Sequence, residues 1–297
     1  MSIIEIKDIT KNYGNNKGVF DLSFNVDEGE VFGFLGPNGA GKTTTIRQLL
    51  GFLNSDKGSC SIFGLDCRAK QDLIQKRVGY LPGEIAFLDE MTGKAYLEFI
   101  ANLRGMTDLT KMNKLIEMFE FDPTGRLKRM SKGMKQKIGI VSAFMHNPDV
   151  LILDEPTSGL DPLMQSRFVE LIKDEQSQGK TILMSSHSFD EVEKTCNRVG
   201  IIKQGKLVSV EEIHALKSAQ AKTYIIEFAT EQEAIDFKKH DFKIVEQNEN
   251  IVKVALKGEM SSLLRCASDY SVKSFETKTQ TLEELFMHFY GGVNNDK

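Results

Sequence analysis

The segment that most constrains this chain is the glycine-rich run GPNGAGKTT at residues 36–44. An apolar run at 31–35 precedes it, and a run with helical spacing at 43–50 follows it. Glycines in such a loop adopt positive φ and leave several backbone N–H groups free to converge on an anion at a helix N-terminus. Lys42 adds a positive charge for the β and γ phosphates, and Thr43 offers a hydroxyl suited to Mg²⁺. The pattern G-x-x-x-x-G-K-[ST] therefore predicts a phosphate-binding loop made of Gly36, Pro37, Asn38, Gly39, Ala40, Gly41, Lys42, Thr43 and Thr44.

Size and composition limit the classes of protein that can carry this loop. The 297 residues, 40% of them hydrophobic, suffice for one large domain and a smaller one. A formal net charge of −4 gives no general electrostatic case for nucleic acid as a partner. The four cysteines are scattered without a C-x-x-C pair, which favours reduced thiols over a zinc site. No apolar run reaches the ~18 residues of a membrane span, and no signal-like N-terminus is present, so we expect a cytoplasmic protein.

The hydrophobic pattern divides the chain into two domains, which we place at 1–217 and 218–297. In the first, short apolar runs alternate with helical patterns, which predicts an α/β domain with a largely parallel sheet. The runs lie at 3–9, 31–35, 78–81, 150–153, 181–185 and 199–202. Strand signals almost vanish between about 84 and 147, and apolar residues recur there at helical spacing. We therefore expect a helical subdomain inserted into the α/β domain.

The second domain has the pattern β-α-β-β-α-β, which is the order of a ferredoxin-like α+β fold. Its expected strands lie at 221–229, 242–245, 251–256 and 272–275, and its expected helices at 231–239 and 260–268. Thr281 and Glu284 form a capping-box pattern that opens a last helix. His240 and His288 are isolated, so this domain offers no catalytic cluster. We assign it a dimerising or regulatory role, and a purely structural spacer is the alternative.

Two adjacent acids, Asp154 and Glu155, follow the apolar run VLIL. The carboxyl ends of parallel strands form the sheet edge where ligands bind. Asp154 is therefore placed to hold Mg²⁺, and Glu155 to accept a proton from an attacking water. Acids at a strand end are also common as solvated turn residues. Their occurrence together with the phosphate loop favours the catalytic interpretation.

Upstream of these acids, the segment RMSKGMKQK opens a helical pattern. Ser131 is suited to the N-cap position, and Gly133 falls in the first turn, which leaves N–H groups free to meet an anion. The basic residues of this segment could equally form a plain solvated helix face. The spacing along the sequence between Ser131 and the acidic pair makes the phosphate-binding interpretation the more specific one.

These motifs, in this order, resemble those of the nucleotide-binding subunit of an ABC (ATP-binding cassette) transporter over residues 2–210. In that family the phosphate loop, an LSGGQ signature, a DEPT strand end, an SGLD segment and a switch histidine follow one another. The resemblance implies an ATPase that uses ATP and Mg²⁺, with two similar subunits that dimerise around two nucleotides. It also implies that Ser131 and Gly133 contact the ATP of the second subunit. A separate integral membrane permease would be the partner that the dimer drives.

Three further residues take their roles from the resemblance. Tyr13 matches the aromatic residue that stacks on adenine, Asp161 matches the residue that links the two sites, and His187 matches the histidine that contacts the γ-phosphate. Taken alone, a tyrosine after a strand is more often a packing residue, and a histidine after a strand is usually a satisfied polar residue. Their positions relative to Lys42 and Asp154 support the functional interpretation.

The chain departs from the family pattern at two places. Its signature reads MSKGM, in which Lys132 and Met134 replace a glycine and a glutamine. In the loop after the strand at 78–81, Gly83 stands where the family has a glutamine, and Glu84 follows it. Either Glu84 substitutes for the glutamine, or the metal relies on Thr43, Asp154 and water alone.

Three features resemble those of the ATPases of ABC-2 type exporters, which lie on the inner face of the membrane. They are the ferredoxin-like tail and the segments SKGMKQK and TLEELFMHFYGG. One alternative is an ATP-gated regulatory or protective module with little turnover. Another is a soluble cassette ATPase that acts on ribosomes or DNA, but those proteins usually carry two cassettes or a long coiled coil. The sequence does not identify a transported substrate.

Overall fold

The computed structural model describes residues 1–88, 90–219, 222–256, 260–279 and 281. The chain separates into two compact units, Met1–Ile213 and His214–Lys297. This division falls a few residues before the position expected from the sequence. Among the described residues, no helix has both the length and the apolar composition needed to cross a bilayer.

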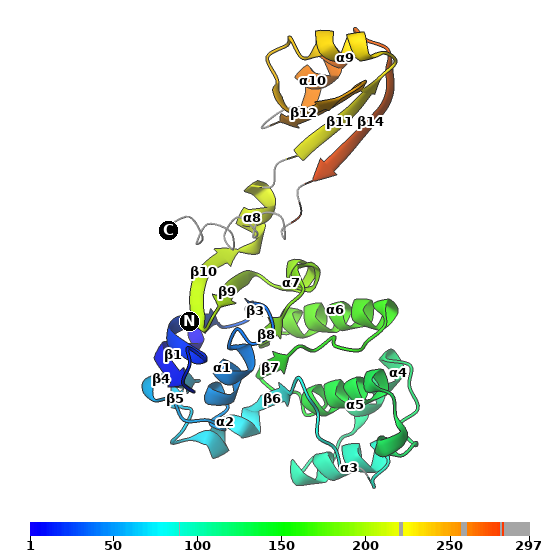
Figure 1. The fold of residues 1–297 in the computed structure, drawn as a ribbon. Helices are drawn as coiled ribbons and strands as arrows, with labels where there is room; N and C mark the ends of the chain where they lie inside the picture. The colour runs from blue at the N-terminus through cyan, green and yellow to red at the C-terminus, as the bar shows by residue number, and fades with distance from the viewer. Residues whose placement is uncertain (89, 220–221, 257–259, 280, 282–297) are drawn as a thin grey trace. The chain divides into compact units, whose positions relative to one another are not determined.

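A six-stranded sheet forms the centre of the first unit (Figure 1). Five of its strands are parallel and β10 is antiparallel to its neighbour β9. The order is β10 (Lys206–Glu212), β9 (Arg198–Lys203), β3 (Val31–Leu35), β8 (Thr181–Ser186), β7 (Val150–Asp154) and β6 (Val78–Leu81). Every residue of β3, β7 and β8 is buried, which explains their continuous apolar sequences. The expected largely parallel sheet is confirmed.

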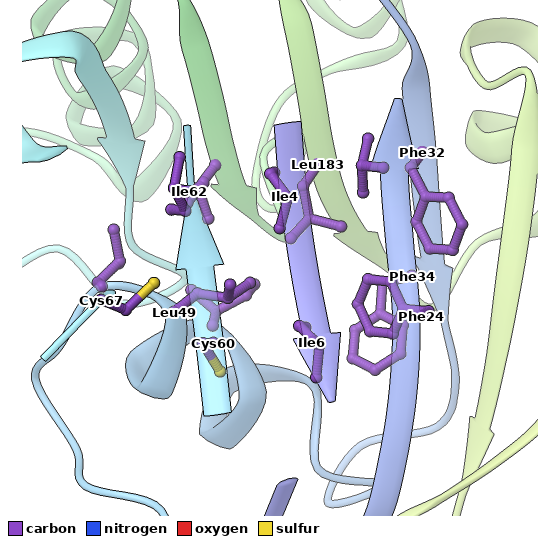
Figure 2. Packing of buried hydrophobic residues seen from close by; sticks show 14 of the residues in the cluster. Ile4, Ile6, Phe24, Phe32, Phe34, Leu49, Cys60, Ile62, Cys67 and Leu183 are labelled. Carbon is purple, nitrogen blue, oxygen red and sulfur yellow. The ribbon is translucent and has the colours of Figure 1, made fainter. Parts of the chain in front are cut away.

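A second, antiparallel sheet packs on the first and was only partly expected. It consists of β2 (Gly18–Asp27), β1 (Ser2–Asn12), β4 (Lys57–Ile62) and β5 (Leu65–Asp66) in that order. Of these four strands, the sequence pattern predicted only β1. Figure 2 shows the apolar core to which both sheets and α1 (Lys42–Leu49) contribute. In it the ring of Phe24 lies 5.0 Å from that of Phe32 and 5.2 Å from that of Phe34.

Helices surround these sheets, and those between β6 and β7 form the expected helical insertion (Figure 1). The insertion contains α3 (Gly93–Leu103), α4 (Thr110–Met118), the 3₁₀ helix η1 (Leu127–Arg129) and α5 (Lys132–Phe144). The other described helices of the first unit are α2 (Gln71–Arg77), α6 (Pro162–Ser177) and α7 (Phe189–Thr195). The helix α8 (Ile213–Ala219) begins at the last residue of this unit and otherwise belongs to the second.

The second unit has its own sheet and core. Its elements are β11 (Lys222–Phe228), α9 (Glu231–Phe237), β12 (Lys243–Asn248), β13 (Ile251–Leu256), α10 (Met260–Ala267) and β14 (Val272–Thr279), and the sheet order is β12-β13-β11-β14. The order of helices and strands is the one expected from the sequence. Phe228, Phe237 and Leu263 are among its fully buried residues. The helix expected after Thr281, with Glu284 and His288, lies outside the described residues.

Candidate active site

The phosphate-binding loop connects β3 to α1, as the sequence predicts. Gly41 precedes α1 with a φ of 113°, a backbone conformation that residues other than glycine rarely adopt. Gly36 is required for a different reason, because a Cβ there would lie 2.4 Å from the carbonyl oxygen of Ile202. The loop therefore turns tightly against β9, and the first turn of α1 follows directly.

Lys42 lies within this loop and is almost fully buried, with 4% of its surface exposed. Its Nζ donates hydrogen bonds to the carbonyl oxygens of Gly36 at 2.7 Å and Pro37 at 3.3 Å. The same Nζ lies 3.3 Å from Oε1 of Glu155. These contacts place a positive charge beside both the loop and the acidic strand end.

Asp154 ends β7 and is 1% exposed. Its Oδ2 accepts a hydrogen bond from Thr43 Oγ1 at 2.7 Å, and its Oδ1 accepts one from Ser185 Oγ at 2.5 Å. The adjacent hydroxyl and carboxylate oxygens of Thr43 and Asp154 are the ligand type that Mg²⁺ prefers, usually with several waters and substrate phosphates completing the octahedron. The residues present therefore fit a magnesium ion.

Glu155 lies between Lys42 and His187. Its backbone has a φ of 48°, and its N–H donates to the carbonyl and hydroxyl oxygens of Ser185 at 3.2 and 3.1 Å. Its Oε2 lies 3.4 Å from Nδ1 of His187, which follows β8. The sheet edge thus brings together three residues that the sequence places far apart.

Glu191 lies beside the candidate site and was not predicted from the sequence. It is 9% exposed in the first turn of α7, and its carboxylate accepts hydrogen bonds from the side chains of Ser186 and Thr157. Burial raises the pKa of Glu191 above its ordinary value. Glu191 therefore connects the loop after β7 with the loop after β8. The spacing Ser188-x-x-Glu191 indicates a helix N-terminus at this position but does not predict the contact with Thr157.

In the described part of the chain, the phosphate loop lines two cavities. The first, of about 450 Å³, is lined by Tyr13, Lys42, Thr44 and Glu155 among others, and the ring-bearing side chain of Tyr13 is 56% exposed. The second, of about 420 Å³, is lined by Thr43, Asp154, Glu155, Gly83 and Glu84 among others. A Cβ at Gly83 would lie 3.4 Å from Oδ2 of Asp154, so a side chain at this position would face the carboxylate.

The remaining predicted residues lie at two helix N-termini. Ser131 is the N-cap of α5 and accepts a hydrogen bond from the N–H of Met134 at 3.2 Å, as expected. Asp161 is the N-cap of α6 and accepts one from Met164 at 3.0 Å. Neither residue lines the two cavities beside the phosphate loop.

This arrangement defines a class. A glycine-rich loop and its lysine lie at the carboxyl edge of a parallel sheet, beside paired acids and a histidine, as in P-loop nucleotide-binding proteins.

Comparison with known proteins identifies the family. Residues 19–158 match the family model described as ABC transporter. The chain is 32% identical to the bacitracin transport ATP-binding protein BcrA of Bacillus licheniformis, over 98% of both chains. It is 34% identical to the linearmycin resistance ATP-binding protein LnrL of Bacillus subtilis, over 70% of this chain and 68% of that protein. A solved ATP-binding subunit of an ABC transporter matches with a TM-score of 0.66 at 29% identity, over 73% of this chain and 92% of the other.

The chain therefore belongs to the family of ABC transporter ATP-binding proteins, which are ATPases. The expected cassette fold and ATP-binding function are confirmed.

Proposed function

We propose that Glu155 is the general base for ATP hydrolysis in this chain. The supporting observation is that its carboxylate lies within 3.4 Å of both the buried Lys42 and His187. In this proposal Lys42 and the loop N–H groups hold the β and γ phosphates, and His187 contacts the γ-phosphate. Tyr13 stacks on the adenine at the mouth of the neighbouring cavity. Glu155 then orients a water and accepts its proton.

Thr43 and Asp154 are the proposed ligands of Mg²⁺, which would neutralise charge on the phosphates. Ser185 fixes the Asp154 carboxylate from the opposite side, so one oxygen faces Thr43. Glu84 lines the same cavity and is the proposed substitute for the glutamine missing at Gly83.

We propose that two copies of the chain, or one copy and a similar subunit, enclose two ATP molecules. Ser131 and Gly133 lie at the N-terminus of α5, where free N–H groups and the helix dipole favour an anion. Within the described part of the chain, Ser131 makes no hydrogen bond to Lys42 or Asp154 and lines neither cavity beside them. A second subunit would bring this helix end, together with Asp161, to the phosphates.

A membrane permease is the proposed partner, and the expected location is the inner face of the membrane. Several large apolar side chains near α2, α3 and the loop after β6 are 41% to 69% exposed, namely Phe52, Leu73, Leu88, Phe99 and Leu103. Arg104, which follows α3, links this helix to α2 and β6 by donating hydrogen bonds to the carbonyl oxygens of Gln75 and Val78. We propose that these residues dock the permease. The names of the bacitracin and linearmycin relatives support drug export as the transport function.

The decisive variant is Glu155→Gln, which keeps the size of the side chain but cannot accept the proton. Loss of a general base costs ~10² to 10⁴ in rate. We expect steady-state ATPase activity to fall by about that factor while ATP still binds, so the ATP-bound dimer should accumulate in size-exclusion chromatography. Wild-type turnover in this variant would contradict the role of Glu155. Negligible turnover by the unsubstituted chain, with and without its permease, would instead favour an ATP-gated regulatory module.

A further inference from the structure

Lys132 is the first residue of α5 and directly follows the N-cap Ser131. Its Nζ donates a hydrogen bond to Ser158 Oγ at 2.8 Å. Its aliphatic stem passes over Gly159, because a Cβ at that glycine would lie 3.0 Å from both Cγ and Cδ of Lys132. The lysine that replaces a glycine of the family signature thus contacts the segment between Glu155 and Asp161.

Two more contacts join the start of α5 to this segment. A Cβ at Gly133 would lie 2.7 Å from the carbonyl oxygen of Gly159, so the two backbones approach closely. The buried amide of Gln136 donates to the carbonyl oxygen of Pro156 at 2.7 Å. A displacement of the N-terminus of α5 must therefore be accommodated by the segment 156–159.

Ser158 is itself bonded to the proposed general base. Its N–H donates to the carbonyl oxygen of Glu155 at 3.1 Å, which closes a turn in which Glu155 has a φ of 48°. Lys132 and Ser158 also line the 420 Å³ cavity that contains Asp154 and Glu155. Two hydrogen bonds thus connect Lys132 to the backbone of Glu155.

We propose that Lys132 is a positioning residue that couples the two nucleotide sites of the dimer. The inference rests on the proposed function, in which Ser131 binds the ATP held by the partner subunit. Nucleotide at that site fixes the N-terminus of α5, and Lys132 transmits this position through Ser158 to Glu155 of its own chain. Gly83 provides no side chain to this cavity. Lys132 belongs to the helical subdomain and therefore provides a side-chain contact between that subdomain and the site.

The test is a double-substitution cycle on ATPase activity. Lys132→Met keeps the stem over Gly159 and removes the ammonium group, and Ser158→Ala removes the acceptor. Because the hydrogen bond is near the surface, each change should lower kcat about twofold to fivefold. Each should also lower the Hill coefficient for ATP towards 1. The double variant should match the single variants, and Lys132→Arg, which can still donate to Ser158, should restore both quantities.

Three controls show whether the effect is specific to the hydrogen bond of Lys132. Lys135→Met removes the same charge from the same helix turn and should leave both quantities near their wild-type values. Equilibrium binding of a fluorescent ATP analogue by the monomer should be unchanged in Lys132→Met, because the phosphate loop of that chain is untouched, and thermal unfolding should show that the variant is folded. Additive effects in the cycle, an unchanged kcat, or a weaker ATP affinity would each overturn the coupling role. Failure of the proposed function itself would be seen separately, as the absence of an ATP-bound dimer in Glu155→Gln.

Discussion

At the scale of residues, the site contains two buried charged side chains, and each has polar partners that offset the cost of its burial. Lys42 and Asp154 are both less than 5% exposed, and burying an isolated charge is very unfavourable. Lys42 is balanced by two carbonyl oxygens and Glu155, and Asp154 by the hydroxyl groups of Thr43 and Ser185. Each charge is therefore held in one position, which is the requirement for aligning a phosphate chain and a metal ion.

Glu84 allows a test of how the site functions without a glutamine at Gly83. If Glu84 contributes to the metal environment, Glu84→Ala should lower the ATPase rate several-fold and raise the Mg²⁺ concentration needed for half-maximal activity. Steady-state ATPase assays across a Mg²⁺ titration measure both quantities. Glu90→Ala, which removes an exposed acid from the same loop region, is the matched control. Unchanged turnover at saturating Mg²⁺ would exclude Glu84 from the site.

The elements that carry the candidate site residues were predictable from the sequence because these residues lie in contiguous motifs. The glycine-rich loop predicts that Lys42 and Thr43 begin a helix, and the apolar run predicts that Asp154 and Glu155 end a strand, whereas the contacts between these two segments come from the fold. Glu191 was not predicted because its hydrogen bond with Thr157 joins two loops that only the fold brings together. The contact between Lys132 and Ser158 could not be predicted for the same reason.

At the scale of secondary structure elements, β2 and β4 escaped prediction because their buried residues form no regular alternation. In β2 the buried residues Val19, Leu22 and Phe24 are spaced by three and then by two residues, and β4 buries only Cys60 and Ile62. Register shifts in the pairing of β1 with β2 accompany the change of spacing, and Asp21 of β2 adopts a φ of 49° there. The buried strands β3, β7 and β8 have no such interruption, so their apolar runs were recognised.

The end of α5 makes a testable contribution to stability. His146 follows α5 and its Nε2 pairs with the carbonyl oxygen of Val78 in β6. Burial, together with Arg104, lowers the pKa of His146 from 6.5 to about 4. The unfolded chain therefore binds this proton first as pH falls, so the stability contributed by the neutral imidazole is present above pH 6.5 and lost between pH 6.5 and 4. The expected loss is about 3 kcal/mol over this whole range and about 2 kcal/mol by pH 5.

Urea unfolding of the wild type and His146→Gln at pH 7.5 and pH 5 measures this effect. The glutamine can donate to the same carbonyl oxygen but does not titrate. The free energy of unfolding should fall more steeply towards pH 5 in the wild type than in the variant. Buried carboxyl groups such as Glu191 titrate in both proteins, so their effect cancels in the comparison. Equal losses in the two proteins would show that His146 does not cause the pH dependence.

At the scale of the whole molecule, each unit has its own buried core. The division was predictable because the order of apolar patterns changes after residue 217. Its position differed by a few residues because α8 extends across the boundary. The ferredoxin-like assignment of the second unit and its dimerising or regulatory role remain predictions.

The reactivity of the four cysteine thiols can show whether these cores remain folded. All are free, and Cys60, Cys67 and Cys196 are buried in the first unit, whereas Cys266 in the second is partly exposed. Burial raises the pKa of Cys60 and of Cys196 to about 12, so little reactive thiolate forms near neutral pH. A thiol reagent at pH 7.5 should modify Cys266 first and the other three only on unfolding, which mass spectrometry can resolve.

Bound nucleotide should slow the modification of Cys60, Cys67 and Cys196. At 100 times its Kd, a ligand stabilises the folded state by about 2.7 kcal/mol, which corresponds to about a hundredfold less global opening. Cys266 serves as the internal reference for reagent concentration. Rapid modification of Cys60 in the native protein, with or without ATP, would contradict the tight core described here.

The internal contacts of Lys42 imply a preference for long anions. Its ammonium group already has three oxygen partners in the chain, so an incoming anion must exchange with them rather than fill free valences. A small ion such as sulfate can replace one partner and gains little from the exchange. A polyphosphate can replace all of them and still reach the amides of the loop. We therefore expect the loop to discriminate by the length of the anion as well as by its charge.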